Sequence, residues 1–280
     1  MPVSPAAKKR VKVILIVLVI IILISPLIYI LISSFKPIKE IMGKVILFPK
    51  QPTLKNYKTL LFARTPVRDF QRILLNTLYV SSLSAILSVA LSAVSAYAIA
   101  RTRELRTGIM SKLLLFIYVF PTIIVLTPMY QLFAGIGLWD SYFGLVVVYT
   151  GLAAPFCTWL LVSFFESIPK ELEESAQVDG ASALKRFLRI VLPLTMPGVI
   201  TVGAYAFITA WGEYMFALVM INSSAKKTAA LGLATFTAEQ YIEWGPLLAG
   251  SIIIILPIFV IFLPVSKLFI RGFMTGAVKG

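Results

Sequence analysis

The sequence predicts an all-α polytopic membrane protein, a bundle of six transmembrane helices. Two observations carry this prediction. Apolar residues make up 59% of the 280 residues and charged residues only 14%, and the mean hydropathy is +0.93, which is typical of a chain whose main solvent is lipid. In addition, six stretches reach the length of about 20 mostly apolar residues that a helix needs to cross the hydrocarbon core.

The six apolar stretches follow one another along most of the chain. They are Val13–Ser34, Ile73–Ala100, Leu113–Phe133, Tyr142–Phe165, Gly198–Ile221 and Leu247–Ile270. The first has the alternative of a cleaved signal peptide, because it is preceded by Lys8, Lys9, Arg10 and Lys12. Its apolar run exceeds that of a signal peptide and Pro26–Tyr29 lacks a small-residue cleavage pattern, so a retained helix is favoured.

Basic residues suggest the orientation. The loop after the second stretch carries Arg101, Arg103, Arg106 and Lys112, whereas the loop 135–140 has no lysine or arginine. Because cytoplasmic loops are enriched in these residues, we expect cytoplasmic N- and C-termini. The outer loop 36–72 is also basic and runs against the rule. A solvated loop is favoured there over contacts with an acidic partner or with anionic headgroups.

A polar segment, 171–193, separates the fourth and fifth stretches. Pro169 suits the first turn of a helix, and Glu171, Glu173 and Glu174 place negative charge near the positive end of that helix. Gly180 tolerates the left-handed backbone that ends a helix, so the first helix should stop there.

A second helix is expected directly after this turn. Ser182 is a candidate N-cap, and the helix should end before Pro193 because the residue preceding a proline avoids helical backbone. The residues alone leave two interpretations open, a segment gripped by a partner and an amphipathic loop on the membrane surface.

The spacing within this segment resembles a known signature. Glu174-Ser175-Ala176, then Gly180, then Ile190-Val191-Leu192-Pro193 is similar to the EAA loop of permease subunits in binding-protein-dependent ABC importers, with Ser175 in place of the first alanine. Other matches support the resemblance: Asn76-Thr77, Ala96-Tyr97-Ala98, Ala100-Arg101, Trp211-Gly212-Glu213-Tyr214 and Phe216-Ala217-Leu218. The terminus, Phe269-Ile270-Arg271-Gly272 with Gly276-Ala277-Val278-Lys279-Gly280, resembles the ends of MalG-like subunits of carbohydrate importers.

The resemblance implies the type I permease fold of ABC importers and a subunit of an ATP-driven sugar importer in a prokaryotic cytoplasmic membrane. Residues 1–71 would hold the N-terminus, first helix and outer loop, residues 72–270 the permease core with its EAA loop at 166–193, and residues 271–280 a cytoplasmic tail. The implied partners are a second, MalF-like permease, two cytoplasmic MalK-like ATPase subunits that bind ATP and Mg²⁺, an external solute-binding protein, the sugar and the lipid bilayer. The implied ATPase-coupling residues are Glu174, Ser175, Ala176, Asp179, Gly180, Ala181, Ile190, Leu192 and Pro193.

Glu213 is the one carboxylate well inside a predicted span. An ionisable residue at membrane depth is a candidate functional residue, because it is costly unless it faces the bundle interior or a wet cavity. With Phe207, Trp211 and Tyr214 it forms a candidate wall of the substrate path. The alternative is a structural hydrogen-bond acceptor that joins neighbouring helices.

Several function classes find little support. The single Cys157 can form no intrachain disulfide, and the chain has no histidine and no GxxxxGK[ST] motif, so we expect no metal site, no cofactor and no enzymatic activity in this chain. Its basic residues alternate between the two sides of the membrane, which argues against nucleic-acid binding. A secondary transporter would need several intramembrane carboxylates, and an intramembrane enzyme a polar cluster. A glycerol-phosphate importer remains an alternative to a sugar importer.

Overall fold

The computed structural model describes residues 5–63, 69–102, 108–238 and 241–277. Arg103 and Arg106 of the predicted inner loop, and residues 278–280 of the predicted tail, lie outside the described residues. The described chain is almost entirely helical, and its only β-structure is a two-stranded hairpin, so the predicted all-α class is confirmed. Contacts between residues divide the chain into two compact units, residues 1–64 with 233–256 and residues 65–232 with 257–280.

The predicted spans correspond to four single helices and two bent pairs. The single helices long and apolar enough to cross a membrane are α1 (Pro5–Ser34), α4 (Phe70–Arg101), α7 (Tyr142–Glu166) and α14 (Trp244–Ala277). The bent pairs raise the number of possible spans to six if each pair is counted as one. Helix α14 continues to Ala277, seven residues beyond the predicted end of the last span.

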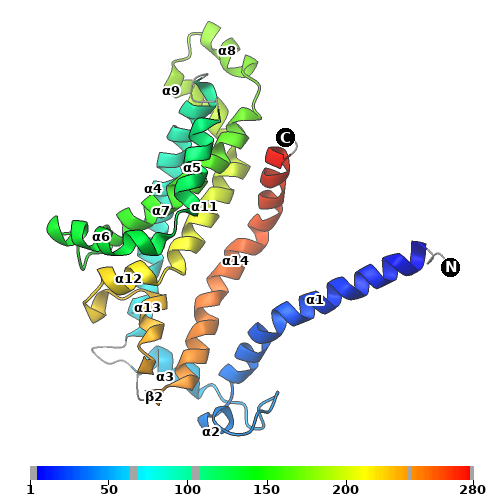
Figure 1. Cartoon of the computed structure of the whole chain (residues 1–280), viewed down its shortest axis with the longest axis vertical. Coiled ribbons are helices and arrows are strands. Elements are labelled where there is room, and N and C mark those ends of the chain that lie inside the picture. The colour runs from blue at the N-terminus through cyan, green and yellow to red at the C-terminus, as the bar shows by residue number, and fades with distance from the viewer. Residues whose placement is uncertain (1–4, 64–68, 103–107, 239–240, 278–280) are drawn as a thin grey trace. The chain divides into compact units, whose positions relative to one another are not determined.

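The core of the second unit is formed by α4, α7 and α11 (Met196–Trp211), which run alongside one another (Figure 1). Helix α4 turns a stripe of small residues inward, among them Ser84, Ser88, Ser92 and Ala96. Small side chains let membrane helices approach closely, which replaces the hydrophobic effect as the source of packing energy in lipid. The stripe therefore explains how α4 packs against both neighbours.

The predicted third span is not one helix. Helix α5 (Ile109–Val119) ends at Phe120, and α6 (Thr122–Gly135) begins after Pro121, with a bend of 83° between them. Proline pushes the preceding residue into extended backbone, and Phe120 indeed has φ −60° and ψ 130°. The predicted stretch 113–133 is therefore a bent pair of helices rather than one straight helix.

The predicted fifth span is also interrupted. Helix α11 ends at Trp211 and a short helix, α12 (Met215–Met220), follows after a break. Beyond it lie a 3₁₀ turn, η2 (Ser224–Lys226), and α13 (Ala229–Ala234). At the other end, α11 is bent by 80° from the helical segment that precedes it.

The first unit contains α1 and the folded outer loop that follows it. The loop includes α2 (Ile38–Ile41) and α3 (Lys55–Phe62). Antiparallel strands β1 (Thr237–Ala238) and β2 (Tyr241–Ile242) precede the start of α14.

Candidate functional site

The polar segment forms a short helix with well-defined ends. Helix α8 (Glu171–Val178) carries Glu171, Glu173 and Glu174 in its first turn, as expected, and stands at one end of the α4/α7/α11 bundle (Figure 1). Pro169 lies just before the N-cap rather than inside the helix. At the other end Gly180 has φ +80°, the left-handed conformation that the sequence predicted.

The turn at Gly180 is a complete Schellman motif. The Gly180 N–H donates to the Gln177 carbonyl at 3.0 Å, and the Ala181 N–H donates to the Ala176 carbonyl at 2.9 Å. These two bonds satisfy carbonyls that a helix end would otherwise leave without partners. Because a Cβ at Gly180 would meet nothing within 4 Å, only the backbone conformation requires glycine there.

The second half of the segment departs from the prediction. Ser182 does cap α9 (Ala183–Arg186), accepting from the Lys185 N–H at 3.4 Å. The helix then widens into a π-helical turn, η1 (Phe187–Val191), and continues through Pro193 in α10 (Leu192–Leu194). The expected end before Pro193 was wrong. In the π turn the Leu192 N–H bonds to the carbonyl five residues back, which places Pro193 in a new first turn where its missing N–H costs nothing.

The predicted coupling residues all lie in the polar segment 171–193, and none of them is fully buried. Glu174, Ser175, Asp179, Gly180 and Pro193 are exposed, whereas Ala176, Ala181, Ile190 and Leu192 are partly buried. The sequence did not single out Val178 and Leu184, whose side chains are 88% and 66% exposed.

Glu173, rather than Glu174, attaches α8 to the bundle. The Tyr97 hydroxyl donates to Glu173 Oε2 at 2.5 Å, and Arg101 Nε pairs with Glu173 Oε1 at 2.6 Å. The same guanidinium donates to the Phe165 carbonyl at 3.0 Å, so one side chain joins the ends of α4, α7 and α8. We call Tyr97, Arg101 and Glu173 the α8 tether. Tyr97 and Arg101 belong to the sequence signatures Ala96-Tyr97-Ala98 and Ala100-Arg101, but nothing in the sequence predicted their contact with Glu173.

The tether is reinforced by aromatic packing. The Tyr97 ring lies 4.9 Å from the Phe187 ring and 6.0 Å from the Phe165 ring, centroid to centroid. Beside it lies a cavity of about 190 Å³, lined by Tyr97, Arg101, Lys170, Glu173, Glu174, Gln177 and Arg186. Helix α8 is therefore attached by hydrogen bonds and an ion pair, and the Tyr97 side chain that takes part in them is packed against two other aromatic rings.

Glu213 lies in the break between α11 and α12 and not along a continuous helix. Its carboxylate caps α12 by accepting from the Phe216 N–H at 2.8 Å and the Ala217 N–H at 3.1 Å. The Tyr149 hydroxyl of α7 donates to the same carboxylate at 2.8 Å. These bonds are those of a structural acceptor that joins helices.

The other predicted substrate-path residues fall into two places. Phe207 and Trp211 stack on α11 with ring centroids 5.4 Å apart, and Trp211 is buried. Tyr214 lies beyond the end of α11, at the N-cap of α12, because Gly212 ends the helix first. The expectation that all four share one helix was wrong.

Asp140 clamps the segment that follows α12. Its carboxylate accepts from the backbone N–H groups of Asn222 and Ser223 and from the Ser223 hydroxyl, and it pairs with Lys226 Nζ at 3.0 Å. Burial raises the pKa of this carboxyl, but the hydrogen bonds from Ser223, Lys226 and Asn222 outweigh burial, so the pKa lies below its ordinary value. Asp140 thus fixes the chain directly after α12.

The Asn76-Thr77 signature holds the same segment from α4. Asn76 Nδ2 donates to the carbonyls of Ala225 at 2.9 Å and Lys227 at 3.0 Å, and Thr77 Oγ1 accepts from the Ala229 N–H at 2.7 Å. The residues between α12 and α13 are therefore fixed from two sides.

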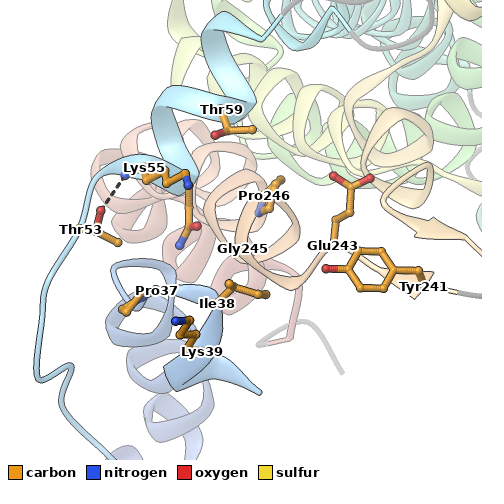
Figure 2. A pocket seen from close by; sticks show the side chains of 11 residues that line it. Pro37, Ile38, Lys39, Thr53, Lys55, Thr59, Tyr241, Glu243, Gly245 and Pro246 are labelled. Carbon is orange, nitrogen blue, oxygen red and sulfur yellow. Dashed lines mark hydrogen bonds between the residues drawn. The ribbon is translucent and has the colours of Figure 1, made fainter. Parts of the chain in front are cut away.

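A cavity of about 590 Å³, which we call the loop cavity, lies in the first unit. Figure 2 shows the side chains that line it. Asn56, one of its lining residues, donates to the carbonyls of Ser34 at 2.8 Å and Lys36 at 2.9 Å and thereby closes the end of α1. Gly245 is required opposite Asn56, because a Cβ there would lie 2.4 Å from Asn56 Oδ1. The lining residues are Pro37, Ile38, Lys39, Thr53, Lys55, Asn56, Thr59, Tyr241, Glu243, Gly245 and Pro246.

Comparison with known proteins identifies the class. Residues 88–269 match the family described as binding-protein-dependent transport system inner membrane component. The chain belongs to this family, and the resemblance found in the sequence is confirmed. It is thus a multi-pass inner membrane component of an ABC importer.

Individual relatives cover nearly the whole chain. The trehalose transport system permease protein SugB of Mycobacterium tuberculosis is 32% identical over 94% of this chain and 95% of its own length. The trehalose/maltose transport system permease protein MalG of Thermococcus litoralis is 30% identical over 97% and 98%. The sulfoquinovosyl glycerol transport system permease protein SmoH of Agrobacterium fabrum is 34% identical over 91% and 88%.

Solved structures show the same fold. A chain of a bacterial ABC transporter involved in the import of the acidic polysaccharide alginate superposes with a TM-score of 0.78 at 22% identity, over 95% of this chain and 99% of that chain. The predicted permease fold of an ABC importer is therefore confirmed.

Proposed function

We propose that this chain is the translocation subunit of an ATP-driven importer for a di- or oligosaccharide, with both termini in the cytoplasm. The relatives named for trehalose and for trehalose/maltose transport support the substrate class. A second, MalF-like permease would complete the pathway, and two MalK-like ATPase subunits would bind ATP and Mg²⁺, so this chain itself needs no cofactor.

In this proposal α8 is the element to which an ATPase subunit binds. The observation that supports this role is that one side of the short helix α8 is attached to the helix bundle while the other side is exposed. Glu173 is fixed to α4 by Tyr97 and Arg101, while Glu174 and Val178 remain exposed for a partner. A helix held this way can transmit a displacement as a rigid lever, because packed interfaces switch between discrete arrangements rather than deform continuously.

The external solute-binding protein would dock on the side of the membrane away from the ATPase subunits. We propose the segment 222–245 as its docking site, and Tyr241 and Glu243 of this segment line the loop cavity together with lysines of the first loop. A solved relative is described as a bacterial alginate ABC transporter in complex with an alginate pentasaccharide-bound periplasmic protein. This supports a partner of that kind for the present chain.

Glycerol phosphate is the second candidate substrate, because the sequence resemblance left it open; the relative named for sulfoquinovosyl glycerol transport is named for a sugar joined to glycerol and agrees with the sugar class. The decisive experiment assembles this chain with a MalF-like permease, MalK-like ATPase subunits and a solute-binding protein from the same organism. ATP hydrolysis is then measured with maltose, trehalose or glycerol phosphate. We expect stimulation by a disaccharide. Stimulation by glycerol phosphate alone would replace the sugar assignment, and an assembly that takes up none of them by ATP hydrolysis would remove the proposal.

A further inference from the structure

The first loop carries an exposed apolar tip that also contains two lysines. Met42, Val45, Leu47 and Phe48 are all well exposed, and Val45 reaches 89%. Lys44 lies within this run and Lys50 follows it, both exposed. We call residues 42–50 the loop tip.

Hydrogen bonds place the tip beside the end of α1. Lys36 is almost fully buried, and its Nζ donates to the Ser33 hydroxyl in the last turn of α1 at 3.2 Å and to the Ile46 carbonyl in the tip at 2.6 Å. One ammonium group therefore touches both the helix end and the tip. Because α1 has the length and composition of a membrane span, the tip lies at the depth where that span leaves the hydrocarbon.

The tip is also held in shape. The Thr53 N–H donates to the Phe35 carbonyl at 2.8 Å and closes the loop at its base. The Glu40 carboxylate accepts from the Lys50 N–H at 3.0 Å and the Gln51 N–H at 3.2 Å. The apolar side chains thus project from a fixed backbone.

The positive charge of the first loop indicates that the loop tip contacts a lipid surface rather than a protein. Residues 36–63 carry Lys39, Lys44, Lys50, Lys55 and Lys58 as exposed cations. Their one acidic residue, Glu40, is engaged by backbone groups. The centres of protein interfaces are depleted of lysine, whereas segments that lie in the membrane interface combine apolar side chains with lysines.

We propose that the loop tip is a membrane-interface anchor. Its apolar side chains enter the boundary between headgroups and acyl chains, and Lys44 and Lys50 contact the phosphodiester groups of anionic lipids. The anchor fixes the depth and rotation of α1 at this end. The proposal rests on α1 as a membrane span and not on the transported substrate.

Site-directed spin labelling of the full chain in nanodiscs tests the anchor. Labels are placed at Leu47→Cys and, as a matched control, at Leu54→Cys, in a Cys157→Ala background. Leu47 and Leu54 are the same residue type, are 58% and 57% exposed and belong to the same loop. We expect the label at position 47 to be accessible to oxygen and shielded from an aqueous nickel chelate, and the label at position 54 to show the reverse.

A second arm tests the lysines. In discs containing an equal mixture of phosphatidylcholine and phosphatidylglycerol, Lys44→Gln with Lys50→Gln should lower the ratio of inserted to water-exposed tip about fivefold per lysine. In phosphatidylcholine alone the same pair should change little. Nickel accessibility at position 47 equal to that at position 54 would overturn the proposal. So would a position-47 label that is water-exposed in the lone chain and shielded from both reagents in the assembled transporter, since a protein would then cover the tip.

Discussion

The α8 tether predicts a defined energetic effect when Glu173 is replaced by glutamine, which removes the charge and almost no volume. The Arg101 and Glu173 side chains are 16% and 10% exposed, and the variant leaves the guanidinium with the Phe165 carbonyl as its remaining acceptor in the tether. Removing one partner of a buried ion pair costs about 3–5 kcal/mol. The glutamine oxygen retains a neutral hydrogen bond from Tyr97, worth about 1 kcal/mol.

The net expectation is a loss of about 2–4 kcal/mol in the attachment of α8, which lowers the ratio of attached to detached helix by roughly thirty- to thousand-fold. Hydrogen exchange of the α8 amides should accelerate. In the transporter reconstituted in vesicles, uptake per ATP hydrolysed should fall. Glu171→Gln, the same change at an exposed position of the same turn, is the control for helix stability. Tyr97→Phe should cost about 1 kcal/mol more when added to Glu173→Gln, because it removes the hydrogen bond that the glutamine retains. Unchanged α8 exchange and unchanged coupling in Glu173→Gln would refute the tether.

Three further predictions concern single residues. Gly180→Val should uncouple hydrolysis from uptake while the chain still inserts, because a β-branched residue is strained at φ +80°, and normal uptake in this variant would remove the lever hypothesis. The folded pKa of Asp140 is lowered, so its contribution to stability should be complete above its ordinary pKa of about 4 and decline as the pH falls below that value. Thermal unfolding between pH 7 and pH 3 should show this decline in the natural chain, and a decline of equal size in Asp140→Asn would contradict it. Glu213→Ala leaves two buried N–H groups without their acceptor and should lower the unfolding free energy by about 1–3 kcal/mol even without substrate. Unchanged stability with altered substrate affinity would favour a substrate role instead.

The sequence was sufficient for features that depend on local chemistry. The apolar stretches, the left-handed Gly180 and the Ser182 cap each follow from a few neighbouring residues, and the structure confirms them. Pro121 also carried a local signal for the break after α5, which hydrophobicity alone concealed. The break at Glu213 was missed because a carboxylate inside an apolar stretch suggests a polar site, whereas here it replaces backbone hydrogen bonds at a new helix start.

The division of roles between Glu173 and Glu174 could not be predicted. Adjacent residues on a helix point about 100° apart, so only the orientation of α8 on the bundle decides which carboxylate faces inward. That orientation depends on Tyr97 and Arg101, more than seventy positions earlier in the chain. The π turn through which the helix continues past Pro193 likewise depends on tertiary packing and not on local sequence, since Phe187 and Val191 in that turn are both buried.

Helix α7 is hydrogen-bonded at two distant positions to other elements of the protein. Its Phe165 carbonyl accepts from Arg101 near α8, and its Tyr149 hydroxyl donates to Glu213 at the start of α12. The two positions are separated by about 24 Å along the helix at about 1.5 Å per residue. Sites this far apart are expected to contribute additively to the stability of the resting protein. If α7 moves as a rigid body, however, both bonds act on one transition, so Tyr149→Phe and Arg101→Met, which removes the donor to the Phe165 carbonyl, should combine additively in thermal unfolding and non-additively in coupled uptake. Additivity in both measurements would show that the two ends of α7 act independently.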